Sequence, residues 1–187
     1  MIAYLDESLR SRECLYVVAA ALVAPPDASE VADELRRVPV GKAPRFHWRN
    51  EGESTRRRML DTIRDLGLRS YAALYCTDHP RWSRRGRVQA IKSLLWTFQG
   101  HTPTIHELVI ETRGSHGDAE DRKAIARAQR SGHADQKLSY RFGSPGNPLL
   151  WVPDAIAGAV SSSFADGIDT YVDRLREAAP HVVDAEP

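Results

Sequence analysis

The chain has 187 residues, 42% of them apolar and 27% charged, which is typical of a globular protein with one hydrophobic core. The longest apolar stretch, residues 15–26, is too short to cross a bilayer, and the N-terminus lacks the pattern of a secretory signal. Two cysteines, with no CxxC pair, favour a reduced cytoplasmic protein. We therefore expect one domain over residues 1–187, with residues 180–187 as a frayed tail and no membrane partner.

The formal net charge is only +1, but it is unevenly distributed along the chain. Residues 41–100 carry 13 basic and 5 acidic side chains, whereas residues 151–187 carry 2 and 7. A basic middle segment favours a surface that binds a polyanion such as nucleic acid. The alternative is a set of solvated helix faces, because exposed arginines are common in proteins of any function.

Apolar runs and helical periodicities alternate along the chain and predict its elements. Residues 2–7 and 15–25 read as two consecutive strands joined as a hairpin, the second buried on both faces. The further expected elements are a helix over 28–37, a short edge strand over 46–48, a helix from 54 to a stop at Gly67, a strand over 68–77, a helix over 88–98, a strand over 105–113, a helix over 118–131, a short strand over 137–142 and a helix of small residues after 148. This order predicts an α/β domain with a mixed sheet.

Acidic residues stand at the boundaries of several predicted elements. Asp6 and Glu7 close the first strand, Glu111 closes the strand over 105–113, and Asp154 lies at the start of the last helix. Carboxylates that converge on one sheet edge bind hard cations such as Mg²⁺ and Mn²⁺, which prefer oxygen ligands. Each acid taken singly also has a structural explanation, as a helix cap, a turn former or an ion-pair partner. Asp6 and Asp154 favour a site most, because a charge within apolar sequence is costly unless it is paired or metal-bound.

Two stretches, YLDES at 4–8 and PLLWVPDAIAGAV at 148–160, resemble the bacterial family known as domain of unknown function 3800. Members of that family typically begin with Tyr-(Ile/Leu)-Asp-Glu-Ser and close with an aspartate followed by small residues on a helix. The resemblance implies a single ribonuclease-H-like domain, with a mixed five-stranded sheet flanked by helices. It also implies a metal-dependent nuclease site.

Carried onto this chain, the resemblance makes Asp6, Glu111 and Asp154 the ligands of one or two Mg²⁺ or Mn²⁺ ions. Glu51 joins them as the fourth catalytic residue, with His47 as an alternative at that place. Asp78, at the end of the strand over 68–77, is an alternative third ligand. Two such ions can stabilise both the attacking and the leaving oxygen of a phosphodiester.

The basic stretch RWSRRGRVQAIK, residues 81–92, is the expected contact with nucleic acid. Its arginines and lysine can meet phosphates, while its tryptophan can stack on a base or pack in the core instead. The residues assigned to this contact are Trp82, Arg84, Arg85, Arg87 and Lys92. A solvated helix face explains the same charges equally well.

These patterns support two hypotheses of different classes. The first is a Mg²⁺- or Mn²⁺-dependent nuclease that hydrolyses RNA, an RNA–DNA hybrid or DNA. The second is a catalytically inactive module that keeps the fold and binds nucleic acid or protein. The chain lacks the spacings of a zinc protease, a serine hydrolase elbow or a nucleotide-binding glycine loop. The oligomeric state stays open.

Overall fold

The structure is a computed structural model that describes residues 1–41, 44–76 and 83–185, with only the backbone described at residues 83–84. Within these residues six strands form one mixed sheet in the order β5-β4-β1-β2-β3-β6. The strands are β1 (Ile2–Arg10), β2 (Leu15–Val23), β3 (Ser70–Cys76), β4 (Glu107–Glu111), β5 (Ser139–Gly143) and β6 (His181–Asp184). Strands β1, β2 and β3 are antiparallel to one another in turn, β4 and β5 run parallel to β1, and β6 runs parallel to β3.

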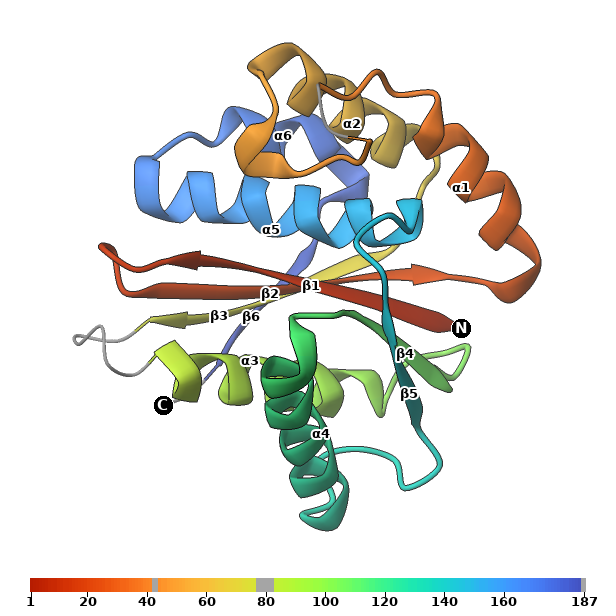
Figure 1. Cartoon of the computed structure of the whole chain (residues 1–187), viewed down its shortest axis with the longest axis vertical. Coiled ribbons are helices and arrows are strands. Elements are labelled where there is room, and N and C mark those ends of the chain that lie inside the picture. The colour runs from red at the N-terminus through yellow and green to blue at the C-terminus, as the bar shows by residue number, and fades with distance from the viewer. Residues whose placement is uncertain (42–43, 77–82, 186–187) are drawn as a thin grey trace.

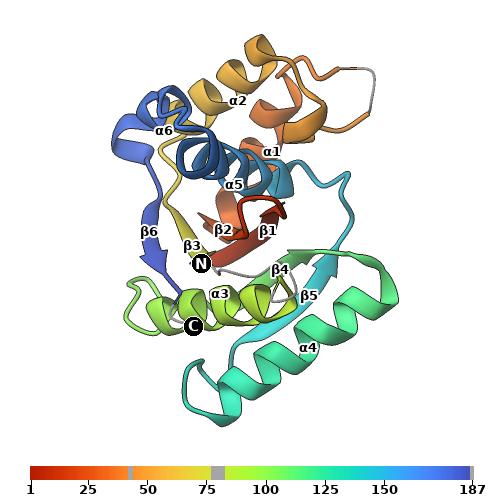
Figure 2. The same cartoon turned by 90° about the vertical axis from the view of Figure 1, so that its left-hand side faces the viewer.

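Helices cover both faces of this sheet (Figure 1). The helices are α1 (Ala28–Arg36), α2 (Glu53–Asp65), α3 (Ser83–Phe98), α4 (Gly114–Arg130), α5 (Pro148–Asp166) and α6 (Thr170–Leu175). Helices α1, α2, α5 and α6 lie on one face, and α3 and α4 lie on the other, as the turned view in Figure 2 also shows. No helix in the described part of the chain is long and apolar enough to span a bilayer.

Helix α5 is the centre of the first helical layer and packs directly on β1 and β2. Asn147 caps its N-terminus by accepting the N–H of Leu149 at 3.1 Å, and Pro148 occupies the first turn, where its missing N–H costs nothing. Every residue from Pro148 to Ser162 is buried, because small residues let the helix approach the sheet closely. Asp154 therefore lies in the second turn of α5, not at the helix start that the sequence predicted.

The core has two parts, one on each side of the sheet. Side chains of β1 alternate between them, so that Tyr4 packs in the layer of α5 whereas Leu5 packs in the layer of α3 and α4. Strand β2 is buried along its whole length, which confirms the prediction of a strand covered on both faces. The alternation of β1 decides where its acidic residues point.

The α/β class and the mixed, helix-flanked sheet are confirmed, but three details differ from the predictions. The sheet has six described strands rather than five, because residues 181–184 of the expected frayed tail pair with the free edge of β3. Residues 46–48 form no strand, and a 3-10 helix covers Trp48–Asn50 instead. Strand β1 continues to Arg10, so Asp6 and Glu7 lie inside it and not at its end.

Candidate functional site

Asp6 and Glu7 lie where the pairing of β1 changes. The parallel pairing with β4 ends at Leu5, opposite Ile110, whereas the pairing with β2 continues to Arg10. The strand alternation directs Asp6 toward the layer of α5 and Glu7 toward α3 and α4. The two neighbouring acids thus belong to different faces of the sheet.

Asp6 is one member of a group of three carboxylates, which we call the acid cluster: Asp6 of β1, Glu111 of β4 and Asp154 of α5. Burial, together with the negative charges of Glu7, Asp154 and Glu111, raises the pKa of Asp6 well above its usual range. The carboxylate of Asp6 accepts the N–H of Glu7 at 2.8 Å. The fold therefore brings together three acids that are separated by more than 40 residues in sequence, at a cost in electrostatic repulsion.

Asp154 has the best-defined surroundings in the acid cluster. Its side chain is buried, and its Oδ2 accepts the backbone N–H of Trp48 at 2.8 Å. The same oxygen lies 3.3 Å from Nδ1 of His47, and this hydrogen bond raises the pKa of His47. The His47 side chain is 41% exposed, so solvent reaches the ring while its Nδ1 is held by Asp154.

The contact between Trp48 and Asp154 depends on a glycine one turn further along α5. A Cβ placed on Gly158 would lie only 2.2 Å from the Trp48 ring, so the ring occupies the space that a side chain would fill. Arg56 covers the Trp48 ring, 4.9 Å from its centroid, and its Nε donates to the Trp48 carbonyl at 2.8 Å. Gly158 thus fixes the segment that brings His47 and the Trp48 N–H to Asp154.

Gly158→Ala is expected to destabilise the fold by about 1–3 kcal/mol, because the new methyl overlaps a ring that is enclosed by α5 and Arg56. Urea unfolding of the variant measures this cost. Gly52→Ala is the matched control, since a Cβ at Gly52 would meet no atom within 4 Å. Equal stability of the two variants would contradict this role of Gly158.

Glu111 has a cationic neighbour. Arg45 Nη1 lies 3.6 Å from Oε1 of Glu111. Burial raises the pKa of Glu111, the positive charge of Arg45 opposes this, and the charge of Asp154 adds to it. Arg45 and His47 therefore place two partly exposed cationic or ionisable groups beside the acid cluster, and nothing in the sequence pattern singled out Arg45.

Glu51 is turned to another partner. It is buried, and both of its carboxylate oxygens accept the N–H of Gly41, at 3.1 and 3.0 Å. A Cβ on Gly41 would lie 3.3 Å from the carboxylate, which explains the glycine there. Glu51 thus binds the backbone of the segment that precedes Trp48, and its carboxylate is already occupied by the N–H of Gly41.

The donor set of the acid cluster consists of carboxylate oxygens, which suits Mg²⁺ or Mn²⁺ chemically. The positions of these carboxylates fit a metal ion less well than their chemistry does. Among residues 1–41, 44–76 and 83–185, no three His, Cys, Asp or Glu side chains are grouped closely enough to hold a metal ion. Asp78, the alternative third ligand, lies outside the described residues.

The residues predicted to contact nucleic acid differ in their exposure to solvent. Arg87 is 5% exposed and its guanidinium binds Asp121 through Nε and Nη2, at 2.6 and 2.7 Å. Its assignment as a surface contact is corrected, since a buried and paired arginine does not meet phosphates. Arg85 is exposed and Lys92 is partly buried on α3. Trp82 and the side chain of Arg84 lie outside the described residues.

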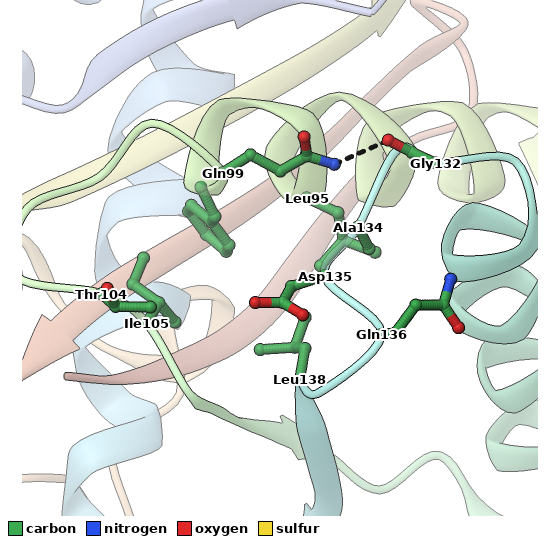
Figure 3. Close-up of a pocket in the computed structure, with 10 residues that line it drawn as sticks. Leu95, Gln99, Thr104, Ile105, Gly132, Ala134, Asp135, Gln136 and Leu138 are labelled. Atoms are coloured by element: carbon green, nitrogen blue, oxygen red, sulfur yellow. Dashed lines mark hydrogen bonds between the residues drawn. The ribbon is translucent and has the colours of Figure 1, made fainter.

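A cavity of about 380 Å³ lies between the end of α3 and the chain that precedes β5 (Figure 3). Leu95, Ile105 and Leu138 give it apolar walls. The Gln99 side chain donates to the carbonyl of Gly132 at 2.8 Å across one side. This cavity holds none of the predicted site residues.

Comparisons with known proteins add no assignment. The chain matches no model of a protein family, and a search of curated proteins finds no match. We therefore infer the function from the geometry of the site and from the two motifs described above.

Proposed function

We propose that the protein is a metal-dependent phosphodiesterase, a nuclease of ribonuclease-H-like fold. The observation that carries the proposal is the acid cluster itself, in which the half-buried Asp6 feels the negative charges of Asp154 and Glu111. A fold that brings three carboxylates together in this way gains stability when a divalent cation joins them. The mixed sheet, with the first acid on its central strand β1, is compatible with the ribonuclease-H-like arrangement that the motifs imply.

In this proposal Asp6, Glu111 and Asp154 would hold Mg²⁺ or Mn²⁺. The ion would supply charge stabilisation for the phosphodiester and an acidified water as the nucleophile. The chain's own groups have distinct parts. Asp154 is oriented by the Trp48 N–H, and Arg45 is placed to attract a phosphate while it neutralises part of the charge on Glu111.

Asp154→Asn tests the proposal in a cleavage assay on single-stranded RNA, an RNA–DNA hybrid and DNA. We expect wild-type cleavage with Mg²⁺ or Mn²⁺, none with a chelator, and a loss of at least about a thousandfold in the variant, because several kcal/mol of charge stabilisation depend on the ion. Asp173→Asn, an exposed carboxylate on α6, is the matched control and should retain full activity. Full cleavage by Asp154→Asn would overturn the assignment.

The second candidate is a binding module that keeps the fold without catalysis. Two observations favour it: His47 and Arg45 already engage Asp154 and Glu111, and the described side chains form no three-ligand group. This candidate predicts salt-dependent binding of nucleic acid with no turnover in any metal. A calorimetric titration with Mn²⁺ separates the two candidates. Only the nuclease requires that Mn²⁺ bind to the protein and that Asp6→Asn weaken this binding.

A further inference from the structure

A second group of charged side chains lies across the sheet from the acid cluster, beneath α3 and α4. Arg87 contacts Glu7 at 2.5 Å and Asp121 at 2.6 Å. Arg113 lies 3.5 Å from Glu7 and 3.3 Å from Asp121. These two arginines and two acids balance one another, so the four side chains together carry no net charge. Gly117 leaves room for Arg113, because a Cβ there would lie 2.7 Å from the Cβ of that arginine.

This network forms one wall of a cavity of about 350 Å³, which is in the size range of small-molecule sites. Apolar side chains supply much of the remaining lining: Leu9, Tyr16, Val88 and Ala124. The Tyr16 hydroxyl lies 3.4 Å from Nη1 of Arg87. Burial, with the charge of Glu7, raises the pKa of Tyr16 to about 12, so the phenol is neutral at physiological pH. One side of the cavity is thus apolar and uncharged, and the other side is formed by the charged arginine network.

Two exposed cations line the cavity. Lys123 and Arg127 line it from successive turns of α4, and both are exposed. Neither forms an ion pair with another residue in the part of the chain that the structure describes. Glu120, the remaining acid of the lining, faces Arg113 and His116. Two cations are therefore left to attract an anionic ligand.

The cavity and the acid cluster lie on opposite faces of the sheet but at the same end of β1. Glu7, which anchors the arginine network, follows Asp6 in β1, and Leu9 lies two residues further on the same face of the strand. The pairing of β1 with β4 ends at Leu5, before both acids, and Arg113 follows Glu111, the last residue of β4, by two residues. Besides burial, the charge of Glu7 raises the pKa of both Asp6 and Glu111, so the two groups of charges influence each other at this end of the sheet.

We propose that this cavity binds one nucleotide of the substrate strand, beside the nucleotide whose phosphodiester meets the acid cluster. The base would lie against the apolar lining beside Leu9 and Val88, and its phosphate would meet Lys123 and Arg127. Contact between exposed cations and the phosphate backbone is a usual means of holding single strands. The inference rests on the proposed nuclease function, and it names where that function would hold its substrate.

The double variant Lys123→Gln/Arg127→Gln tests the inference through binding of a fluorescently labelled ten-nucleotide single strand, in chelator, so that no cleavage intervenes. We expect wild-type binding, weakened on the order of tenfold in the variant at about 0.1 M salt. Its slope of log affinity against log salt should fall by about 0.7 for each cation removed. Val88→Trp, which fills the cavity and leaves every charge in place, should weaken binding as well.

The matched control is Arg122→Gln/Arg130→Gln, which removes the same charge from α4 outside the cavity lining. Equal weakening by both double variants would overturn the inference, as would wild-type affinity in Lys123→Gln/Arg127→Gln or in Val88→Trp with an intact circular dichroism spectrum. Equal competition by a ten-residue polyglutamate would overturn it too, because the cavity would then recognise charge alone. Cleavage lost in Asp154→Asn with binding unchanged in the cavity variants would refute this inference and leave the nuclease proposal standing.

Discussion

Asp6→Asn is expected to abolish cleavage and, in the same protein, to raise the free energy of unfolding at neutral pH by about 0.5–2 kcal/mol, the usual range for relieving a strained functional site. The stabilising part follows from charge. Asp6 is half-buried near the negative charges of Glu7, Asp154 and Glu111, so the folded state disfavours its ionisation. Asparagine keeps the size of the side chain and removes the repulsion.

The pH dependence of this gain has a definite sign. The pKa of Asp6 is raised in the folded protein, so the folded state holds this proton more tightly than the unfolded chain does. The stability of the wild type therefore falls as pH rises from the ordinary aspartate pKa, about 4, toward the raised value. The advantage of Asp6→Asn should be absent below about pH 4 and fully present above the raised pKa, as urea unfolding at a series of pH values would show.

Metal binding reverses the comparison. Mn²⁺ at a hundred times its dissociation constant should stabilise the wild type by about 2.7 kcal/mol and leave Asp6→Asn nearly unchanged. Asp173→Asn is again the matched control and should follow the wild type in both measurements. A variant that is no more stable than the wild type at neutral pH, and that still gains stability from Mn²⁺, would contradict the assignment of Asp6.

Arg87→Ala is expected to lower the free energy of unfolding by about 3–5 kcal/mol, because it leaves the buried Asp121 and the half-buried Glu7 without their main partner. Burial disfavours the charged form of Arg87, but Asp121 and Glu7 more than offset this and raise its pKa well above the usual value. The bidentate contact with Asp121 at 2.6 and 2.7 Å is the strongest part of the network. Chemical unfolding of the variant measures the cost.

Lys92→Ala is the control for this prediction, since it removes a partly exposed cation from the same helix and should change stability by no more than about 0.5 kcal/mol. The double variant Arg87→Ala/Asp121→Ala should lose less than the sum of the two single changes, because one unpaired charge disappears with its partner. A loss below 1 kcal/mol in Arg87→Ala would mean that water reaches this network freely.

The sequence was most informative where burial follows local pattern. The Val-rich run of β2 predicted a strand covered on both faces, and the stripe of apolar residues over 88–98 predicted most of α3. The prediction of an edge strand at 46–48 was wrong because of a contact that is distant in sequence. The N–H of Trp48 donates to Asp154, more than 100 residues away, so it is not available to a neighbouring strand. The tail at 181–184 became a strand because β3 offered a free edge.

The acidic residues of the candidate site also show that local sequence does not reveal distant partners. Their sequence contexts already singled out Asp6 and Asp154, because charges within apolar runs need compensation. Glu51 was assigned to the site through the family resemblance, and its carboxylate accepts the N–H of Gly41 in the structure. Arg87 looked like its neighbour Arg85, but one helical face packs on the sheet and the other faces solvent. The position of a residue in the sequence does not tell which residues it contacts in the folded protein.

The sequence by itself determined the class of the fold, the order of most of its elements and the pair of acids, Asp6 and Asp154, whose apolar surroundings demand an explanation. Only the tertiary structure decided which face of the sheet each charge occupies. Strand alternation sends Asp6 to the acid cluster and Glu7 to the arginine network, although the two residues are adjacent. The physical reason is that electrostatic partners are set by packing in space, where β1, β4 and α5 meet.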